Sequence, residues 1–99
     1  MLKPIMALQG FKDYISNAGR QGKKDQVVDA FLRSGDCLFL LKQYREANTY
    51  YNRVVDFKYK GADYAMYQMG ESFYRQNNYQ GSVGQFDRLI RSFRKSSYR

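Results

Sequence analysis

The chain has 99 residues, of which 17 are Lys or Arg, 9 are Asp or Glu and none is His, so its formal net charge is +8. This length suits one domain with a modest core. No continuous apolar stretch in the sequence is long enough to span a membrane. The lack of His removes most hydrolytic and zinc chemistry, so we expect no catalytic residue, no cofactor and no metal site.

The positive charge raises the question of an acidic partner such as nucleic acid. The basic residues are spread along the whole chain, however, and adjoin at most in pairs such as Lys23–Lys24. This spacing is typical of a solvated surface that keeps a protein soluble. The single cysteine, Cys37, has no His to activate it as a nucleophile, so we expect it to pack in the core.

Five segments carry the apolar spacing of amphipathic helices. The first covers residues 4–16 and has Pro4 in its first turn, where proline is tolerated. Residues 17–24 contain two Gly and hardly any apolar residue, so we interpret them as a linker. The other helices are expected at residues 25–41, 44–57, 62–77 and 80–95, with a turn at 58–61.

The sequence repeats itself at an interval of 35 residues. Residues 35–44 read GDCLFLLKQY and residues 70–79 read GESFYRQNNY. Identical residues at this interval include Ala30 with Ala65 and Arg53 with Arg88, and similar residues fill the positions between them. Because residue size stays in register over a whole helix pair, we interpret the two segments as a true internal repeat.

The repeated unit resembles the tetratricopeptide repeat, a helix–turn–helix unit of about 34 residues. Its first helix places Gly four residues after a large side chain, and its second helix places an aromatic residue four residues after a small one. In this sequence the matching pairs are Phe31 with Gly35, Met66 with Gly70, Ala47 with Tyr51 and Ser82 with Phe86. Ala7 and Phe11 keep the second-helix spacing as well, so residues 4–16 look like half of a preceding copy.

The resemblance implies an all-α fold, with antiparallel helix–turn–helix repeats in a right-handed α-solenoid of about five helices. One domain, residues 1–99, would hold a half repeat, the linker and repeats at 25–57 and 60–95, as a fragment of a longer array. Two features depart from the pattern: neither copy ends in Pro, and Ser34 stands where an apolar residue is usual.

Three positions have a predicted structural role within these repeats. Gly35 and Gly70 are expected where two helices cross so closely that a side chain would push them apart. Asn78 is expected to be a good N-cap for the last helix, whereas Gln43 is a poor cap for the equivalent helix of the first copy.

Members of this family line a concave groove with their first helices and bind a peptide or helix of a partner there. With Phe31, Gly35 and Leu38 assigned to the core, the opposite stripe of each first helix would face the partner, with Asp29 at its edge. The candidate partner-binding residues are Leu32, Asp36, Phe39, Tyr64, Tyr67, Gln68, Glu71, Tyr74 and Arg75.

Such a groove favours apolar, Lys or Arg side chains of a partner. Tyr64, Tyr67 and Tyr74 are the expected anchors, because Tyr gives contact area and a hydrogen bond at low entropic cost. The alternative is that these rings pack against neighbouring helices. The stripe lacks the basic pair with which some members bind a chaperone's terminal carboxylate, so this binding mode is not expected.

The leading functional hypothesis is therefore a non-enzymatic scaffold for protein–protein interaction. The alternative is a basic helical repeat that binds nucleic acid, which would require Lys and Arg to gather on one face. An enzyme is a distant third hypothesis.

Two further expectations concern context. The apolar residues Phe86, Leu89, Ile90 and Phe93 suggest that another helix covers residues 80–95, from a longer array or from a second copy of the chain. The second copy, through residues 93–98, is also similar to family members from the bacterial envelope, namely the Tol-Pal coordinator and the outer-membrane assembly lipoprotein. That similarity would place the parent protein in the periplasm.

Overall fold

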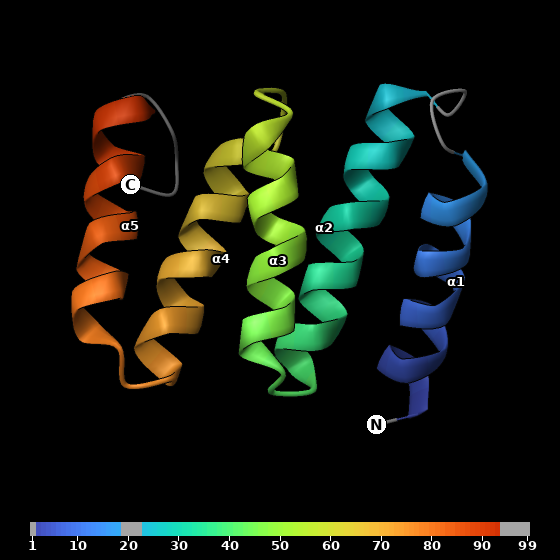
Figure 1. Ribbon diagram of the computed structural model, residues 1–99, viewed down its shortest axis with the longest axis horizontal. Coiled ribbons are helices and arrows are strands. Elements are labelled where there is room, and N and C mark those ends of the chain that lie inside the picture. The colour runs from blue at the N-terminus through green and yellow to red at the C-terminus, as the bar shows by residue number, and fades with distance from the viewer. Residues whose placement is uncertain (1, 19–22, 94–99) are drawn as a thin grey trace.

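The computed structural model describes residues 2–18 and 23–93. Its helices are α1 (Leu2–Ala18), α2 (Lys24–Leu40), α3 (Tyr44–Asp56), α4 (Ala62–Arg75) and α5 (Tyr79–Ser92). They lie side by side in one row, and each runs opposite to the preceding one (Figure 1). The described residues contain no strand, so the predicted all-α fold of about five helices is confirmed.

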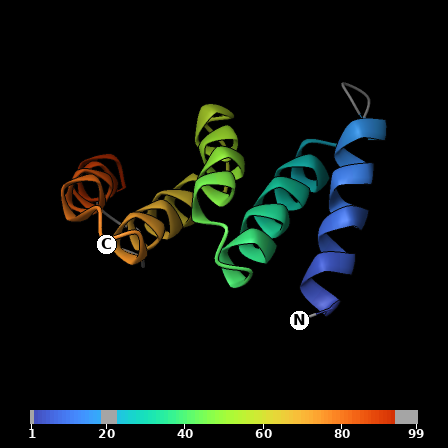
Figure 2. The same ribbon diagram turned by 60° about the horizontal axis from the view of Figure 1, so that its bottom comes forward.

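The helix ends lie close to their predicted positions. α1 extends beyond residues 4–16 at both ends, and α5 ends at Ser92, because Phe93 leaves the helix with a φ of −134°. Residues 19–22 of the predicted linker and residues 94–95 of the last predicted helix lie outside the described residues. In Figure 2, α3 is displaced to one side of its neighbours α2 and α4. These two helices therefore lie on the same side of the row.

The turns after α2 and α4 have the same backbone geometry. Lys42 and Asn77, which follow these helices, both have a φ of 61°. The next amide in each turn donates to a carbonyl five residues earlier at 2.8 Å, which closes both helices in a Schellman motif. The Asn78 side chain then caps α5 by accepting from the Gly81 amide at 2.9 Å, whereas Gln43 makes no cap bond, as predicted.

Two glycines set the closest helix crossings. A Cβ atom on Gly35 of α2 would lie 2.7 Å from the Tyr51 ring of α3, and a Cβ on Gly70 of α4 would lie 2.7 Å from the Phe86 ring of α5. Both distances are far below van der Waals contact, because the aromatic ring of the second helix lies directly against the glycine backbone. The predicted role of both glycines is therefore confirmed.

The core runs along the row between successive helices. The largest fully buried side chains include Tyr51, Leu38, Val54 and Leu89. Burying one such side chain contributes about 1.5–3 kcal/mol. Phe31 adds tilted contacts with the rings of Tyr50 and Phe57, at centroid distances of 5.9 and 5.7 Å.

Two small polar groups are buried in α2. Ser34 has no exposed surface, and its hydroxyl donates to the Ala30 carbonyl at 2.8 Å, which satisfies a polar group where the repeat pattern has an apolar one. Cys37 is also buried, as predicted. Burial and then the neighbouring Asp36 carboxylate raise the pKa of its thiol, so the thiol stays neutral.

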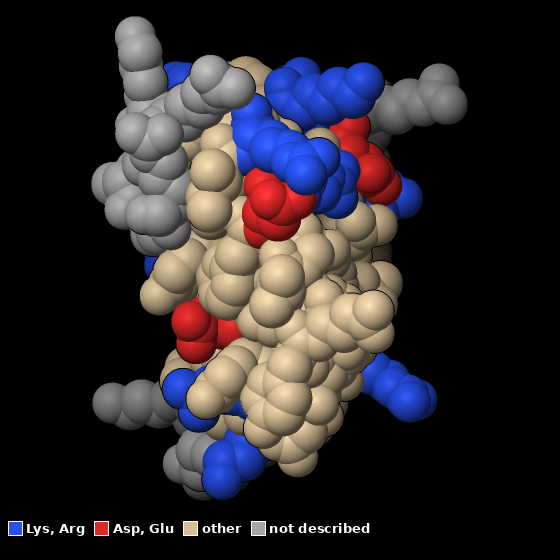
Figure 3. All heavy atoms as spheres, turned by 90° about the vertical axis from the view of Figure 1, so that its left-hand side faces the viewer, with Lys and Arg blue, Asp and Glu red and all other residues tan. Residues whose placement is uncertain are grey.

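The outer face of α5 is only partly apolar. Leu89, which we expected to need cover from another helix, is fully buried within the chain. Ile90 and Val83 are 50% and 66% exposed. Seen from the α5 side, uncharged surface separates Lys and Arg near the two ends of the face (Figure 3).

Candidate functional site

Three side chains meet at the carboxylate of Asp36, on the side of the row shared by α2 and α4. Oδ1 of Asp36, on α2, accepts from the Tyr51 hydroxyl of α3 at 2.5 Å and from the Tyr64 hydroxyl of α4 at 2.8 Å. The Gln68 amide nitrogen lies 3.2 Å from the Tyr64 hydroxyl and 3.4 Å from Asp36. We call these residues the Asp36 cluster, and its bonds tie three helices together.

Burial fixes the protonation of Tyr51 in the Asp36 cluster. Desolvation of the fully buried Tyr51, followed by its hydrogen bond to Asp36, raises the pKa of that phenol far above its usual range. The phenol therefore stays a neutral donor to Asp36. Chemically this arrangement holds helices in place, and three predicted partner-binding residues, Asp36, Tyr64 and Gln68, are bonded to one another within it.

A second group of predicted residues lies at the carboxyl ends of α2 and α4. The Arg75 guanidinium lies 5.4 Å from the centre of the Phe39 ring, a cation–π distance, and the Tyr44 ring packs edge-on against Phe39 at 5.3 Å. A pocket of about 530 Å³ adjoins them and is lined by Lys42, Tyr44, Glu71, Tyr74, Arg75 and Asn77. We call it the Tyr74 pocket.

Two apolar side chains are exposed at this end of α2 and α4. The Tyr74 ring packs edge-on against Tyr79 at 5.3 Å but remains 58% exposed, and Leu40 at the end of α2 is 60% exposed. The remaining predicted residues lie elsewhere. Leu32 contacts the turn at Gly61, and Tyr67 packs against the Phe86 ring of α5 at 5.9 Å.

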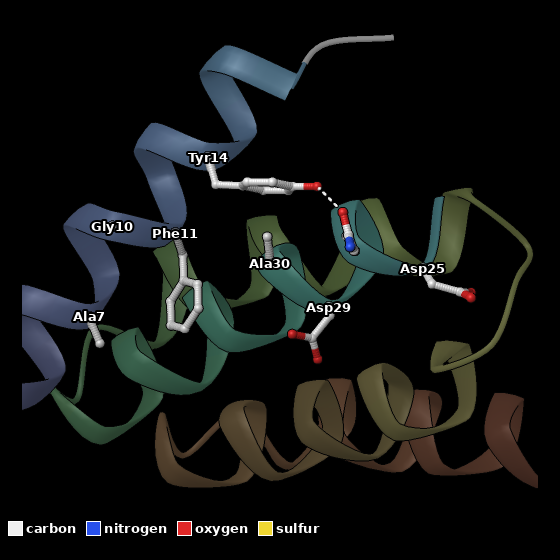
Figure 4. Close-up of a pocket in the computed structure, with 8 residues that line it drawn as sticks. Ala7, Gly10, Phe11, Tyr14, Asp25, Asp29 and Ala30 are labelled. Atoms are coloured by element: carbon white, nitrogen blue, oxygen red, sulfur yellow. Dashed lines mark hydrogen bonds between the residues drawn. The ribbon is translucent and has the colours of Figure 1, made fainter. Parts of the chain in front are cut away.

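A third feature is a groove between α1 and α2, of about 680 Å³ (Figure 4). Its residues from α1 and α2 are Ala7, Gly10, Phe11, Tyr14, Asp25, Gln26, Asp29 and Ala30, and we call it the α1/α2 groove. The Tyr14 hydroxyl donates across it to Gln26 Oε1 at 3.0 Å. Of these residues, the sequence analysis had placed only Asp29 near a partner-binding stripe.

Several residues of these sites were missed in the sequence. Tyr51 was assigned to the core alone, and its hydroxyl gave no signal because its acceptor lies 15 residues away on another helix. Lys42 and Asn77 occupy equivalent places in the repeat, but turn residues lie outside the helical stripes that were searched. Ala7 and Phe11 did carry a signal for the α1/α2 groove, namely the second-helix spacing.

The described residues offer few other functional groups. Within 2–18 and 23–93, no helix is long and apolar enough to cross a membrane. In the same ranges, no three His, Cys, Asp or Glu side chains come together in a way that could hold a metal ion.

Comparison with known proteins places the repeats in a family. The tetratricopeptide repeat model matches residues 29–56 and 64–96, which is more than half of the chain. A search of curated proteins and a search of solved structures found no match.

Proposed function

Because the chain belongs to the tetratricopeptide repeat family, whose repeats generally mediate protein–protein interaction, we propose that it is a non-enzymatic scaffold that binds a peptide or helix of a partner. The binding surface is the side shared by α2 and α4, centred on the Tyr74 pocket. The observation that supports this choice most is the exposure of Tyr74, which lines a pocket of about 530 Å³ at the end of α4. Exposed apolar side chains next to a concave surface are typical of interaction sites.

The two groups of side chains on this surface have different roles, one in positioning the helices and one in contacting the partner. The Asp36 cluster keeps α2 and α4 at a fixed separation, so Tyr64 is a positioning residue rather than an anchor. Tyr74 and Leu40 provide the apolar contact, while Glu71 and Arg75 line the surface next to them. This surface suits a partner segment with an apolar side chain flanked by polar or charged ones.

Selection from a random peptide library on the immobilised protein tests this proposal. The selected peptides are measured against Leu40→Ala/Tyr74→Ala and against a matched control, Met6→Ala/Ile90→Ala, which removes apolar side chains of comparable exposure from α1 and α5. We expect the first pair to weaken binding at least about tenfold, since hot-spot side chains carry about 2 kcal/mol or more each. Equal effects of the two variants would reject this surface.

The nucleic-acid alternative lacks a supporting observation. It requires a continuous basic track, whereas the α5 side shows its Lys and Arg near the two ends (Figure 3). Three basic side chains of the described residues are already paired with acids: Lys12 with Glu46, Arg33 with Asp29 and Arg91 with Asp87.

Self-association through residues 80–95 remains part of the proposal, because Val83 and Ile90 are exposed on α5. Sedimentation equilibrium of the natural protein and of Val83→Asp/Ile90→Asp measures it. A wild-type dimer that the variant abolishes would support the proposal, and a wild-type monomer at all concentrations would reject it.

We also propose a periplasmic location, which rests on the resemblance of the second copy, through residues 93–98, to the envelope members. Fractionation of cells that carry the natural gene distinguishes a periplasmic from a cytosolic product.

A further inference from the structure

Acids and bases on the side shared by α2 and α4 differ in whether the chain itself already pairs them. From the sequence we expect this side to favour a partner's Lys or Arg, because Asp29, Asp36 and Glu71 are assigned to it. In the structure Asp29 Oδ1 lies 3.4 Å from Arg33 Nε, and Asp36 accepts from two tyrosine hydroxyls. Two of these three acids therefore already have partners within the chain.

The bases of the Tyr74 pocket are not paired in this way. Lys42 lies in the turn after α2, Arg75 is the last residue of α4, and both side chains are exposed. Among the described residues, neither of them takes part in an ion pair. Glu71 is the one acid in the lining, and it makes no ion pair with either base. The lining therefore has two bases that are available to a ligand against one acid.

Arg75 is held by a contact that uses none of its hydrogen-bond donors. Its guanidinium lies over the Phe39 ring, 5.4 Å from the centre of the ring, and the π face of that ring takes the place of an acceptor. The N–H groups of the guanidinium thus remain for a ligand, and a carboxylate can accept from two of them at once. Because the ring already restricts the side chain, less conformational entropy is lost when a ligand binds.

Two neutral groups of the pocket add further donors. Asn77 Oδ1 accepts from the Tyr79 hydroxyl at 3.2 Å, which leaves the amide nitrogen of Asn77 to donate. The Tyr44 hydroxyl, also in the lining, has no acceptor among the described residues. The pocket therefore offers more donors than acceptors, and more positive than negative charge. A carboxylate matches both properties, because it is negatively charged and only accepts hydrogen bonds.

We propose that the partner segment places an Asp or Glu side chain at Lys42 and Arg75, next to the apolar side chain that packs on Tyr74. Because this assignment names the chemistry of the segment that the Tyr74 pocket binds, it rests on the proposed function. The carboxylate is that of a side chain within the segment, since a segment that lies along α2 and α4 passes the pocket with its side chains. The carboxyl terminus of the partner is the other source of the same group, and the experiment separates the two.

The probes are the library-selected peptides whose binding is weakened by Leu40→Ala/Tyr74→Ala, made with an acetylated amino terminus and an amidated carboxyl terminus. Only side chains can then supply a carboxylate. We expect each peptide to carry Asp or Glu near its apolar anchor. Exchanging that residue for Asn or Gln should weaken binding about tenfold in fluorescence anisotropy, since hydrogen bonds to a charged group are strong enough to change affinity by this factor.

Three protein variants locate the carboxylate. Lys42→Gln/Arg75→Gln should weaken the acidic peptide about tenfold and leave its amide version unchanged. Lys58→Gln/Arg88→Gln is the matched control, because it removes the same charge and Lys58 is also a turn residue with a positive φ, 51° against 61° for Lys42. Arg75→Glu should bind a peptide with Lys in place of the acid more tightly than the acidic peptide. Circular dichroism confirms that each variant remains helical.

Four results would overturn the proposal and leave the proposed function in place. These are selected peptides without an acid, equal binding of the acidic and amide peptides, equal effects of the two Gln variants, and an Arg75→Glu variant that still prefers the acidic peptide. Peptides that bind only with a free carboxyl terminus would assign the pocket to a chain end instead. If no selected peptide depends on Leu40 and Tyr74, the proposed function is rejected, and the acidic segment with it.

Discussion

At Asp36, a single carboxylate oxygen accepts hydrogen bonds from two tyrosine hydroxyls that come from different helices. Hydrogen bonds to a charged acceptor are stronger than neutral ones, and partial burial limits their screening by solvent. Each of Tyr51 and Tyr64 therefore contributes twice, by burying an aromatic ring and by fixing the position of α2 relative to its neighbours. From its position on the helical stripe alone, Tyr64 would be judged a groove residue.

Replacing Tyr51 by Phe tests this role through its pH dependence. At pH 7 we expect Tyr51→Phe to lower the free energy of unfolding by about 1.5 kcal/mol, because the charged acceptor loses a donor. In the natural protein the folded state keeps the Tyr51 proton, since its pKa is raised, while the unfolded chain loses it near pH 10. The stability that Tyr51 provides is thus complete below pH 10 and falls at higher pH.

The difference in the free energy of unfolding between the natural protein and Tyr51→Phe should therefore become smaller above pH 10, by about 1.4 kcal/mol for each pH unit. Urea unfolding of both proteins at pH 7 and at two values between 10 and 11 measures it, and the effects of other titrating groups cancel in the difference. A gap that stays constant up to pH 11 would show that the pKa of Tyr51 is not raised in the folded protein.

Glycine allows two helices to approach closely at their crossing. The effect on stability of replacing a glycine at a crossing can be compared with that of replacing one in open space. Gly35→Ala should lower the free energy of unfolding by about 1–2 kcal/mol. The overlap with the buried Tyr51 ring outweighs the gain in helix propensity of about 1 kcal/mol. Gly84→Ala, on α5, places a methyl group in open space and should raise stability by up to about 1 kcal/mol.

Thermal unfolding followed by circular dichroism measures both variants. Opposite signs for the two substitutions are the expected result. If Gly35→Ala were as stabilising as Gly84→Ala, α2 and α3 would not cross as closely as the structure places them.

The helices and their crossings could be predicted from the sequence, because residues that pack in the same way recur at a fixed interval in a repeat. Gly35 and Gly70 recur at one interval, with a matching aromatic residue on each following helix. Helix ends were less certain, and the end of α5 at Ser92 was missed because Phe93 still fits the apolar spacing.

The candidate site could be predicted only in outline. A helical stripe tells which way a side chain points, and Glu71, Tyr74 and Arg75, which were assigned to one stripe, all line the Tyr74 pocket. It doesn't tell which polar atoms meet, so the bonding of Tyr51 with Asp36 was not foreseen. The α1/α2 groove was missed because residues 4–16 were considered as a helix and not as one wall of a site.

In the molecule as a whole, the most extensive contacts join successive helices, as in a one-dimensional array. α2 lies between two neighbours and has seven buried residues, whereas the end helix α5 has two. We expect amide hydrogens of α1 and α5 to exchange faster than those of α2, α3 and α4, because an end helix can detach without breaking the other interfaces.

Hydrogen exchange followed by NMR at neutral pH resolves the five helices. Uniform protection across all of them would mean that the chain unfolds as one cooperative unit, or that the end helices are covered in solution. A concentration-dependent rise in the protection of α5 would identify self-association as the source of that cover.

The central claim is that α2 and α4 together present a surface for a partner, with its contact area at their carboxyl ends. The most direct test is the change in amide chemical shifts of the ¹⁵N-labelled protein as a library-selected peptide is added. The account predicts that the largest shifts lie at residues 39–42 and 71–77. Largest shifts on the outer face of α5, or on α3, would contradict it.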